Sequence, residues 1–389
     1  MNKRLLNKTL LFMAALGILF TSACSNEDSE ILHTAAKQGN ITTVRKLIEK
    51  GVDVNTENND GLTALHYASR GNHIELVKDL IEQGADVNKK CHANDGEFTP
   101  LMLATHNNYL EVALELMKSG ANVNIEGKGG WTALHYASRG NHVALVKVLI
   151  EHGADVNKKC ETIKGKFTPL MLAVYNNYSE VALELMKSGA DVNAICNTTE
   201  GKRTPLMLAA VNNQIEIAQE LIKANADVNI NDEDGWTALH YASREGYTKI
   251  AKGLINAGAD VNAICNTTEG KRTPLMLAAV NNQIEIAQEL IKANADINMK
   301  DKNGDTAFTL TARCGNVEFL RNINKLPNLN KDEMENLIKF ASHVKAEREA
   351  EFRAGLEARA RAEKRREDDT FEWAVLNAWN FSNGMGYMW

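Results

Sequence analysis

Apolar residues recur along this chain in two alternating kinds of block. The first is a short run such as LMLAAV, which follows a threonine–proline pair and ends at Asn212 and Asn213. The second is amphipathic, with apolar residues at the i, i+3, i+6 and i+7 spacing of a helix that buries one face. In one copy these residues are Ile215, Ala218, Leu221 and Ile222. The pattern predicts a pair of short helices in each unit.

The residues at the predicted helix ends agree with this interpretation. Thr204 is suited to cap the first helix, and Pro205 stands at the first helical position, where a missing N–H costs nothing. The position after the second helix holds only Gly or Asn, which enter the left-handed backbone region most readily. This column comprises Gly51, Gly84, Gly120, Gly153, Gly189, Asn225, Gly258 and Asn294.

The unit repeats along most of the chain. The threonines that open successive units are Thr63, Thr99, Thr132, Thr168, Thr204, Thr237, Thr273 and Thr306. They lie 36, 33, 36, 36, 33, 36 and 33 residues apart, and residues 189–227 recur unchanged, 69 residues later, as residues 258–296. One helix pair of this size cannot bury its apolar face alone, so the units must stack on their neighbours.

The period and the motifs TALHYA, TPLMLA and GADVN resemble the ankyrin repeat. This resemblance implies an all-α solenoid of about nine repeats, in which the DVN and DG segments form extended hairpins between units. The array is predicted over residues 25–330, and its first and last repeats are expected to be end caps. The repeats lie near 28–58, 59–93, 94–128, 129–163, 164–199, 200–233, 234–268, 269–302 and 303–330.

Residues 331–389 are predicted to form a helical extension. Its first part is amphipathic and should cover the last repeat, through Met334, Leu337, Ile338, Ala341 and Val344. Residues 345–369 follow as a charged, solvated helix with pairs such as Glu349–Arg353 and Glu357–Arg361. The aromatic-rich segment 371–389 either folds back on the stack or docks a partner or a membrane interface.

Residues 1–24 have the pattern of a secretory signal peptide. A basic segment precedes an apolar run over residues 10–20, which is shorter than the about 20 residues that span a membrane. The sequence SAC, ending at Cys24, resembles the lipobox of bacterial lipoproteins, in which the cysteine is acylated. Thr21 stands where that family usually has leucine, so an ordinary cleaved signal peptide is the alternative.

The lipoprotein resemblance also implies a location. A palmitate-type lipid anchor on Cys24 would hold the protein in a bacterial membrane, and Ser25 favours the outer membrane. The protein would then face either the periplasm or the cell exterior. The alternative is a secreted protein.

Composition and motifs narrow the class of function. A net charge of −6 argues against nucleic acid as the main ligand. The sequence has no glycine-rich phosphate loop, nucleophile elbow or HExxH motif, so we expect no enzyme and no cofactor.

Cysteine and histidine positions predict no metal site. Cys91, Cys160, Cys196 and Cys265 lie in the longer hairpins without zinc-type spacing, and Cys314 lies in the last repeat. Free thiols are favoured, because only Cys160 and Cys196 are in adjacent units, where one strained bridge is conceivable. By the ankyrin resemblance, His66, His135 and His240 are structural and hydrogen-bond to neighbouring backbone.

The same resemblance implies a partner-binding concave face, built from two columns of side chains. One column precedes each threonine and the other ends the first helix. The candidates are Leu62, Arg70, Phe98, His106, Trp131, Arg139, Phe167, Tyr175, Arg203, Trp236, Arg244 and Arg272. Tryptophan, tyrosine and arginine are enriched at binding hot spots, although Trp131 and Trp236 could instead pack across the base of their own hairpins.

The sequence therefore predicts a monomeric, membrane-tethered binding protein. Its partner is a protein of unknown identity, and aromatic and arginine columns suit an extended acidic or aromatic segment. A passive envelope spacer and a host-directed secreted effector are the alternatives.

Overall fold

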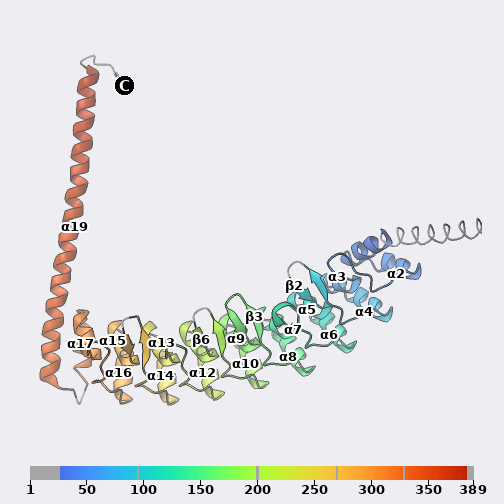
Figure 1. The fold of residues 1–389 in the computed structure, drawn as a ribbon, viewed down its shortest axis with the longest axis horizontal. Coiled ribbons are helices and arrows are strands. Elements are labelled where there is room, and N and C mark those ends of the chain that lie inside the picture. The colour runs from blue at the N-terminus through green and yellow to red at the C-terminus, as the bar shows by residue number, and fades with distance from the viewer. Residues whose placement is uncertain (1–26, 94–95, 199–200, 269, 327–328, 383–389) are drawn as a thin grey trace, which may run out of the picture. The chain divides into compact units, whose positions relative to one another are not determined.

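The computed structural model describes residues 27–93, 96–198, 201–268, 270–326 and 329–382. Within these residues the chain forms nine helix pairs followed by one long helix (Figure 1), which confirms the predicted all-α repeat array. The opening helix spans residues 27–37. The later first helices are α3 (Ala64–Arg70), α5 (Pro100–His106), α7 (Ala133–Arg139), α9 (Pro169–Tyr175), α11 (Pro205–Val211), α13 (Ala238–Glu245), α15 (Pro274–Val280) and α17 (Ala307–Arg313).

The second helices are slightly longer. They are α2 (Ile41–Glu49), α4 (Ile74–Glu82), α6 (Leu110–Lys118), α8 (Val143–Glu151), α10 (Ser179–Lys187), α12 (Ile215–Lys223), α14 (Thr248–Asn256), α16 (Ile284–Lys292) and α18 (Val317–Ile323).

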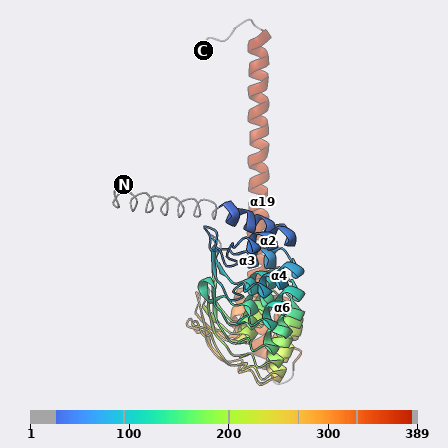
Figure 2. The same cartoon turned by 90° about the vertical axis from the view of Figure 1, so that its right-hand side faces the viewer.

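The chain divides into two compact units. The first comprises Met1–Ala242 with Asn256–Ala259, and the second comprises Ser243–Ile255 with Asp260–Trp389. In the first unit, α3, α5, α7, α9 and α11 contact one another in order, as do α2, α4, α6, α8, α10 and α12. The hairpins of that unit gather on one side of these helices, and the second helices form the other side (Figure 2). In the second unit, α15 contacts α17, and α16 contacts α18.

The helix caps follow the sequence prediction. Thr204 is an extended N-cap whose side chain accepts a hydrogen bond from the Met207 amide, and Pro205 begins α11. Asn213 has a φ of 55°, in the left-handed region between the two helices of the pair. All eight members of the Gly/Asn column after the second helices also have positive φ, so their prediction as left-handed residues is confirmed.

Two of the four residues predicted for the buried stripe of the second helix are only half-buried. In α12, Ile217, Ala218 and Leu221 are buried, whereas Ile215 and Ile222 are half-buried. The helix therefore turns its i, i+1 and i+4 positions inward. This face is buried because the first helix of the same repeat packs on it. The second helix of the neighbouring repeat packs beside it.

Among the described residues, strands form in the hairpins where the spacing between threonines is 36 residues, and the 33-residue units have shorter hairpin turns closed by backbone bonds. The strand pairs are β1 (Cys91–Ala93) with β2 (Gly96–Phe98), β3 (Cys160–Thr162) with β4 (Gly165–Phe167), β5 (Cys196–Thr198) with β6 (Gly201–Arg203), and β7 (Cys265–Thr267) with β8 (Gly270–Arg272). The three extra residues provide the length for a three-residue ladder. Because two long hairpins are adjacent, Gly165 pairs with Thr198 and joins β3–β6 into one sheet.

The thiols at the starts of these strands are not cross-linked. Cys91, Cys160, Cys196 and Cys265 are buried, and no disulfide joins any of these four residues. Burial raises the pKa of Cys160 to about 12 and also raises the pKa of Cys196. The thiols of Cys160 and Cys196 therefore stay protonated and pack as small apolar groups.

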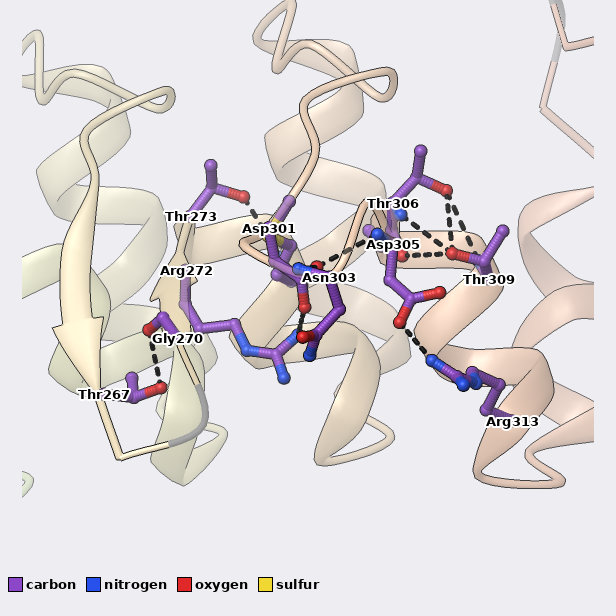
Figure 3. Close-up of polar contacts among 12 residues, drawn as sticks. Thr267, Gly270, Arg272, Thr273, Asp301, Asn303, Asp305, Thr306, Thr309 and Arg313 are labelled. Carbon is purple, nitrogen blue, oxygen red and sulfur yellow. Dashed lines mark hydrogen bonds and ion pairs between the residues drawn. The ribbon is translucent and has the colours of Figure 1, made fainter.

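Short turns replace the strands where the spacing is 33 residues. Asp301 accepts the backbone N–H groups of Asn303 and Asp305 on Oδ1, at 2.8 and 2.9 Å (Figure 3). Asp232 accepts those of Asp234 and Trp236 in the same way. A side chain that closes its own backbone turn in this manner is a recognised role of Asp and Asn.

The histidines of the TALH motif tie backbone segments together, as the resemblance implied. The Thr63 amide donates to Nδ1 of His66 at 3.1 Å, which leaves Nε2 as the protonated nitrogen. Nε2 then donates to the carbonyls of Lys89 and Phe98 at 3.1 and 3.2 Å. His135 repeats the arrangement with Thr132 and Lys158. Burial lowers the pKa of both His66 and His135 to about 4.

An asparagine of the DVN segment links each repeat to the next. The Asn124 side chain donates to the Gly153 carbonyl at 2.8 Å and accepts the Asp155 amide at 2.8 Å. Asn55 makes the equivalent pair of bonds to Gly84 and Asp86. The same bridge joins Asn88 to Gly120 and Asn122, and Asn157 to Gly189 and Asp191. These side chains form an asparagine ladder along the array, which the sequence pattern alone did not reveal.

The helical extension is α19 (Lys331–Ser382), which contacts α17 and α18. Of the five residues predicted to face the last repeat, Met334 and Ala341 are buried and Leu337, Ile338 and Val344 are half-buried. Farther along, Arg361 pairs with Glu357 at 3.1 Å on a solvated helix, as predicted. No helix in the described part of the chain is both long and apolar enough to span a membrane. Residues 1–26, with Cys24, and the aromatic side chains of 371–389 lie outside what the structure describes.

The asparagine ladder gives a first prediction. Asn124→Ala removes two hydrogen bonds between repeats and should lower the free energy of unfolding by about 1–2 kcal/mol. The matched control is Asn59→Ala, because Asn59 is exposed and none of the described residues hydrogen-bonds to its side chain. Urea denaturation of the three proteins measures the difference. Equal losses in both variants would contradict a linking role for Asn124.

A second prediction concerns acid. His66 and His135 bind their protons near pH 4 in the folded state and near pH 6.5 when unfolded, so the unfolded state holds more protons between these values. Stability should therefore fall as the pH drops from about 6.5 to 4, by about 3 kcal/mol for each histidine. The double variant His66→Met/His135→Met, with the residue type found at Met102 and Met171, should lose this part of the pH dependence. If the melting temperatures of the two proteins fall equally with pH, the histidines do not cause this part of the pH dependence.

Candidate functional site

Eight of the twelve predicted site residues meet in one groove of the first unit. The groove has a volume of about 1020 Å³. The predicted residues in its wall are Leu62, Arg70, Phe98, His106, Trp131, Arg139, Phe167 and Tyr175. One set ends the hairpins, directly before the capping threonines, and the other set is the last residue of each of α3, α5, α7 and α9. The repeat geometry brings both sets to the same surface.

The middle of the groove is an aromatic cluster around Tyr136. The ring of Tyr136 lies 5.0 Å from that of Trp131, 5.8 Å from that of Phe98 and 5.5 Å from that of His106, centroid to centroid. At the next repeat, Phe167 and Tyr175 meet edge to face at 5.9 Å. Such rings provide a rigid apolar surface with polar edges, which is favourable for contact with another molecule.

Trp131 both packs within the stack and faces the groove. Its Nε1–H donates to the carbonyl of Glu161 in β3 of the following hairpin, at 2.8 Å. The guanidinium of Arg139 lies 5.5 Å from the ring centroid, on the groove side. The ring remains half-buried, with one part held in the stack and another part open to the groove.

The cations of the groove differ from most others on the hairpins. Lys89, Lys158 and Lys202 are paired with Glu57, Glu126 and Glu233, at 2.5, 2.5 and 3.4 Å. In contrast, no carboxylate of the described residues forms an ion pair with Arg70, Lys128 or Arg139, and all three side chains are exposed. Glu161, the one acidic residue in the groove wall, is paired with Lys166. The groove is therefore positively charged on a protein whose net charge is −6.

The hairpin tip of β3–β4 forms one edge of the groove. Ile163 at the tip is 96% exposed, and Lys164 lies over the ring of Tyr175, with Nζ 4.7 Å from the centroid. Lys164 also donates a hydrogen bond to the Tyr175 hydroxyl. The sequence analysis selected neither residue, because both are contributed by the insertion of this repeat rather than by the two aligned columns.

The other four candidates lie outside the groove. The guanidinium of Arg203 is 5.3 Å from the Tyr241 ring, and Arg244 pairs with Glu245 at 2.6 Å. Trp236 is 9% exposed and stacks on Tyr241 at 5.0 Å. Arg272 is 5% exposed and forms an ion pair with Asp301 at 3.1 Å (Figure 3). Trp236 and Arg272 thus present little surface to another molecule, and so does Phe167 in the groove itself, at 2%.

Two titratable side chains beside the groove are held within the protein. The nearby histidine His135 is fully buried and bonded to backbone, and the nearby thiol of Cys160 is protonated. No group of three or more metal-ligating side chains occurs among the described residues. What the groove provides is an aromatic surface with flanking positive charge.

Comparison with known proteins assigns the chain to a family. A profile of ankyrin repeats (3 copies) matches residues 14–91, 32–127, 101–196 and 170–265, and a profile of ankyrin repeats (many copies) matches residues 254–310. These matches cover well over half of the sequence, so the chain belongs to the ankyrin repeat family. Ankyrin repeats are protein–protein interaction modules, and their stacked units form extended binding surfaces.

Similarity to individual curated proteins is confined to the repeats. The chain is 34% identical over 94 residues to the nuclear factor NF-kappa-B p105 subunit of Gallus gallus, which covers 23% of this chain and 10% of that protein. It is 33% identical over 86 residues to the NF-kappa-B inhibitor alpha of Gallus gallus, covering 22% and 27%. It is 33% identical over 96 residues to Rabankyrin-5 of Homo sapiens, covering 22% and 8%. The match spans less than a third of each relative's length.

Proposed function

We propose that this protein is a non-enzymatic ankyrin repeat lipoprotein of a bacterial envelope, which captures a protein partner in the groove of its first unit. The groove carries the proposal. It combines an aromatic cluster, three exposed cations without carboxylate partners and an exposed isoleucine at its edge. Each of these features costs stability or solubility on a free surface and becomes favourable when a partner covers it.

The charge distribution supports a selective groove over a passive spacer. A spacer needs only length and no particular grouping of side chains. The groove instead brings Arg70, Lys128 and Arg139 together with an aromatic cluster, and Arg139 lies over Trp131. Arginine beside tryptophan is a combination that contributes strongly to protein interfaces.

The proposed membrane tether rests on the amino-terminal pattern. The apolar run over residues 10–20 and the SAC sequence ending at Cys24 support acylation at that cysteine, and Ser25 supports the outer membrane. Acylation would keep the repeat array next to the membrane, where its partner is either another envelope protein or a host protein.

The third prediction tests the groove. Trp131→Ala/Arg139→Ala should abolish capture of protein partners from envelope extracts or host lysates by the full-length protein, and the helical circular-dichroism signal should stay unchanged. The matched control is Arg244→Ala/Arg313→Ala, which removes two residues of the same column outside the groove. Capture that survives the first change would favour a spacer. Loss of helicity would assign Trp131 a structural role instead.

The fourth prediction tests the tether. Cells fed a labelled palmitate analogue should label the wild-type protein, which should partition into the detergent phase of a membrane extract. Cys24→Ser should remove both the label and the partitioning, because the acceptor thiol is gone. Wild-type protein found unlabelled in the culture medium would contradict the tether and favour a secreted effector.

A further inference from the structure

Three repeats carry the same tyrosine in the motif ALHYA, but only two of these hydroxyls are hydrogen-bonded to another of the described residues. Asn58 Nδ2 donates to the Tyr67 hydroxyl at 3.0 Å, and the Tyr241 hydroxyl donates to Asp232 Oδ2 at 2.5 Å. Both partners stand five positions before the capping threonine. In the third repeat that position is Gly127, which has no side chain to offer.

The close approach of another segment explains the glycine. A Cβ at Gly127 would lie 2.2 Å from the carbonyl oxygen of Glu97 in β2, so no other residue fits there without a shift of the backbone. The turn keeps the backbone bond that the other two repeats also have, since the Gly127 amide donates to the Trp131 carbonyl at 2.7 Å, but it lacks their Asn or Asp side chain. As a result, none of the described residues forms a hydrogen bond with the Tyr136 hydroxyl, although the side chain is half-buried and lines the groove.

Tyr136 is suited to act as a hydrogen-bond donor to a ligand. Burial raises its pKa to about 12, and the positive charge of Arg139 opposes part of that rise. The hydroxyl is therefore protonated at neutral pH, and Arg139 is near enough to act on the same bound group. Arg139 follows Tyr136 by three residues in α7, which places the two side chains one helical turn apart.

We propose that the Tyr136 hydroxyl and the Arg139 guanidinium together bind a carboxylate of an extended, acidic segment of the protein partner, with the side chain next to that carboxylate packed on the Trp131 ring. Arg70 and Lys128 then meet further carboxylates along the same segment. This inference rests on the proposed function, because it identifies the chemistry of the partner in the same groove. Tyr136 acts as a specificity residue that the aligned columns did not contain.

An acidic protein segment fits better than a nucleic acid. The groove has few cations on a chain of net charge −6, whereas a nucleic-acid surface needs a continuous positive field to neutralise successive phosphates. The alternation of aromatic rings with single cations instead matches a peptide in which apolar and acidic side chains alternate.

The test is the fluorescence anisotropy of three labelled probes mixed with the full-length protein. The two peptides match in length, and the oligonucleotide matches the acidic peptide in charge. These are a peptide of repeating Glu-Glu-Tyr, the matched peptide of repeating Gln-Gln-Tyr, and oligothymidylate. The Glu peptide should bind, the Gln peptide should bind at least about tenfold more weakly, and oligothymidylate should bind more weakly than the Glu peptide. Added salt should weaken binding of the Glu peptide.

The fifth prediction uses a pair of matched variants. Tyr136→Phe should weaken binding of the Glu peptide about tenfold and leave the melting temperature unchanged, because the lost hydroxyl has no partner among the described residues. Tyr241→Phe should lower the melting temperature and leave binding of the Glu peptide unchanged, since its hydroxyl bonds to Asp232 and lies outside the groove. Arg139→Gln should weaken binding at least as much as Tyr136→Phe.

Three results would overturn the inference: equal binding of the Glu and Gln peptides, oligothymidylate binding as tight as the Glu peptide, or no effect of Tyr136→Phe. The proposed function fails separately. If capture from extracts still requires Trp131 and Arg139 but the Glu peptide does not compete with it, the groove binds a partner of other chemistry. If capture is insensitive to Trp131 and Arg139, the groove is not the binding site at all.

Discussion

The array depends on the bonds that join each repeat to the next. An asparagine side chain satisfies one carbonyl and one amide of the following repeat at once, as Asn124 does for Gly153 and Asp155. The carbonyl is that of the left-handed residue that ends the second helix, a group that the helix itself leaves unsatisfied. The buried histidines add a second link, from the cap of one helix to the hairpin that follows it. Both links fix the spacing of neighbouring repeats, and that spacing places the groove residues beside one another.

Neighbours also decide what identical sequences do. Residues 189–227 and 258–296 are the same, yet their arginines have different surroundings. Arg203 lies over the ring of Tyr241 in the following repeat. Arg272 is buried against Asp301, in a repeat where Leu310 replaces the tyrosine. The role of a side chain in a stack of this kind is therefore set by the pair of repeats and not by the repeat alone.

This dependence explains how far the sequence could predict the structure. The period, the threonine caps, and the Gly and Asn residues of positive φ are properties of a single unit, and the structure confirms them. The sequence predicted hairpins between units but not which of them contain paired strands, because the pairing requires the three extra residues of the longer units. The sequence selected two columns of candidate residues, and eight of the twelve candidates share the groove. It could not indicate that Arg272 is buried, nor that Gly127 leaves the Tyr136 hydroxyl without a hydrogen bond to any described residue, because both facts arise from contacts with other segments.

The central claim is that partner binding takes place in the groove of the first unit. Hydrogen–deuterium exchange of the full-length protein, alone and with its captured partner, tests this directly. Slower exchange should be concentrated in the groove repeats, from Leu62 to Asn176, with the largest change in α7 and the β3–β4 hairpin. Protection confined to α19 or to the second helices, with the groove repeats unchanged, would contradict the account.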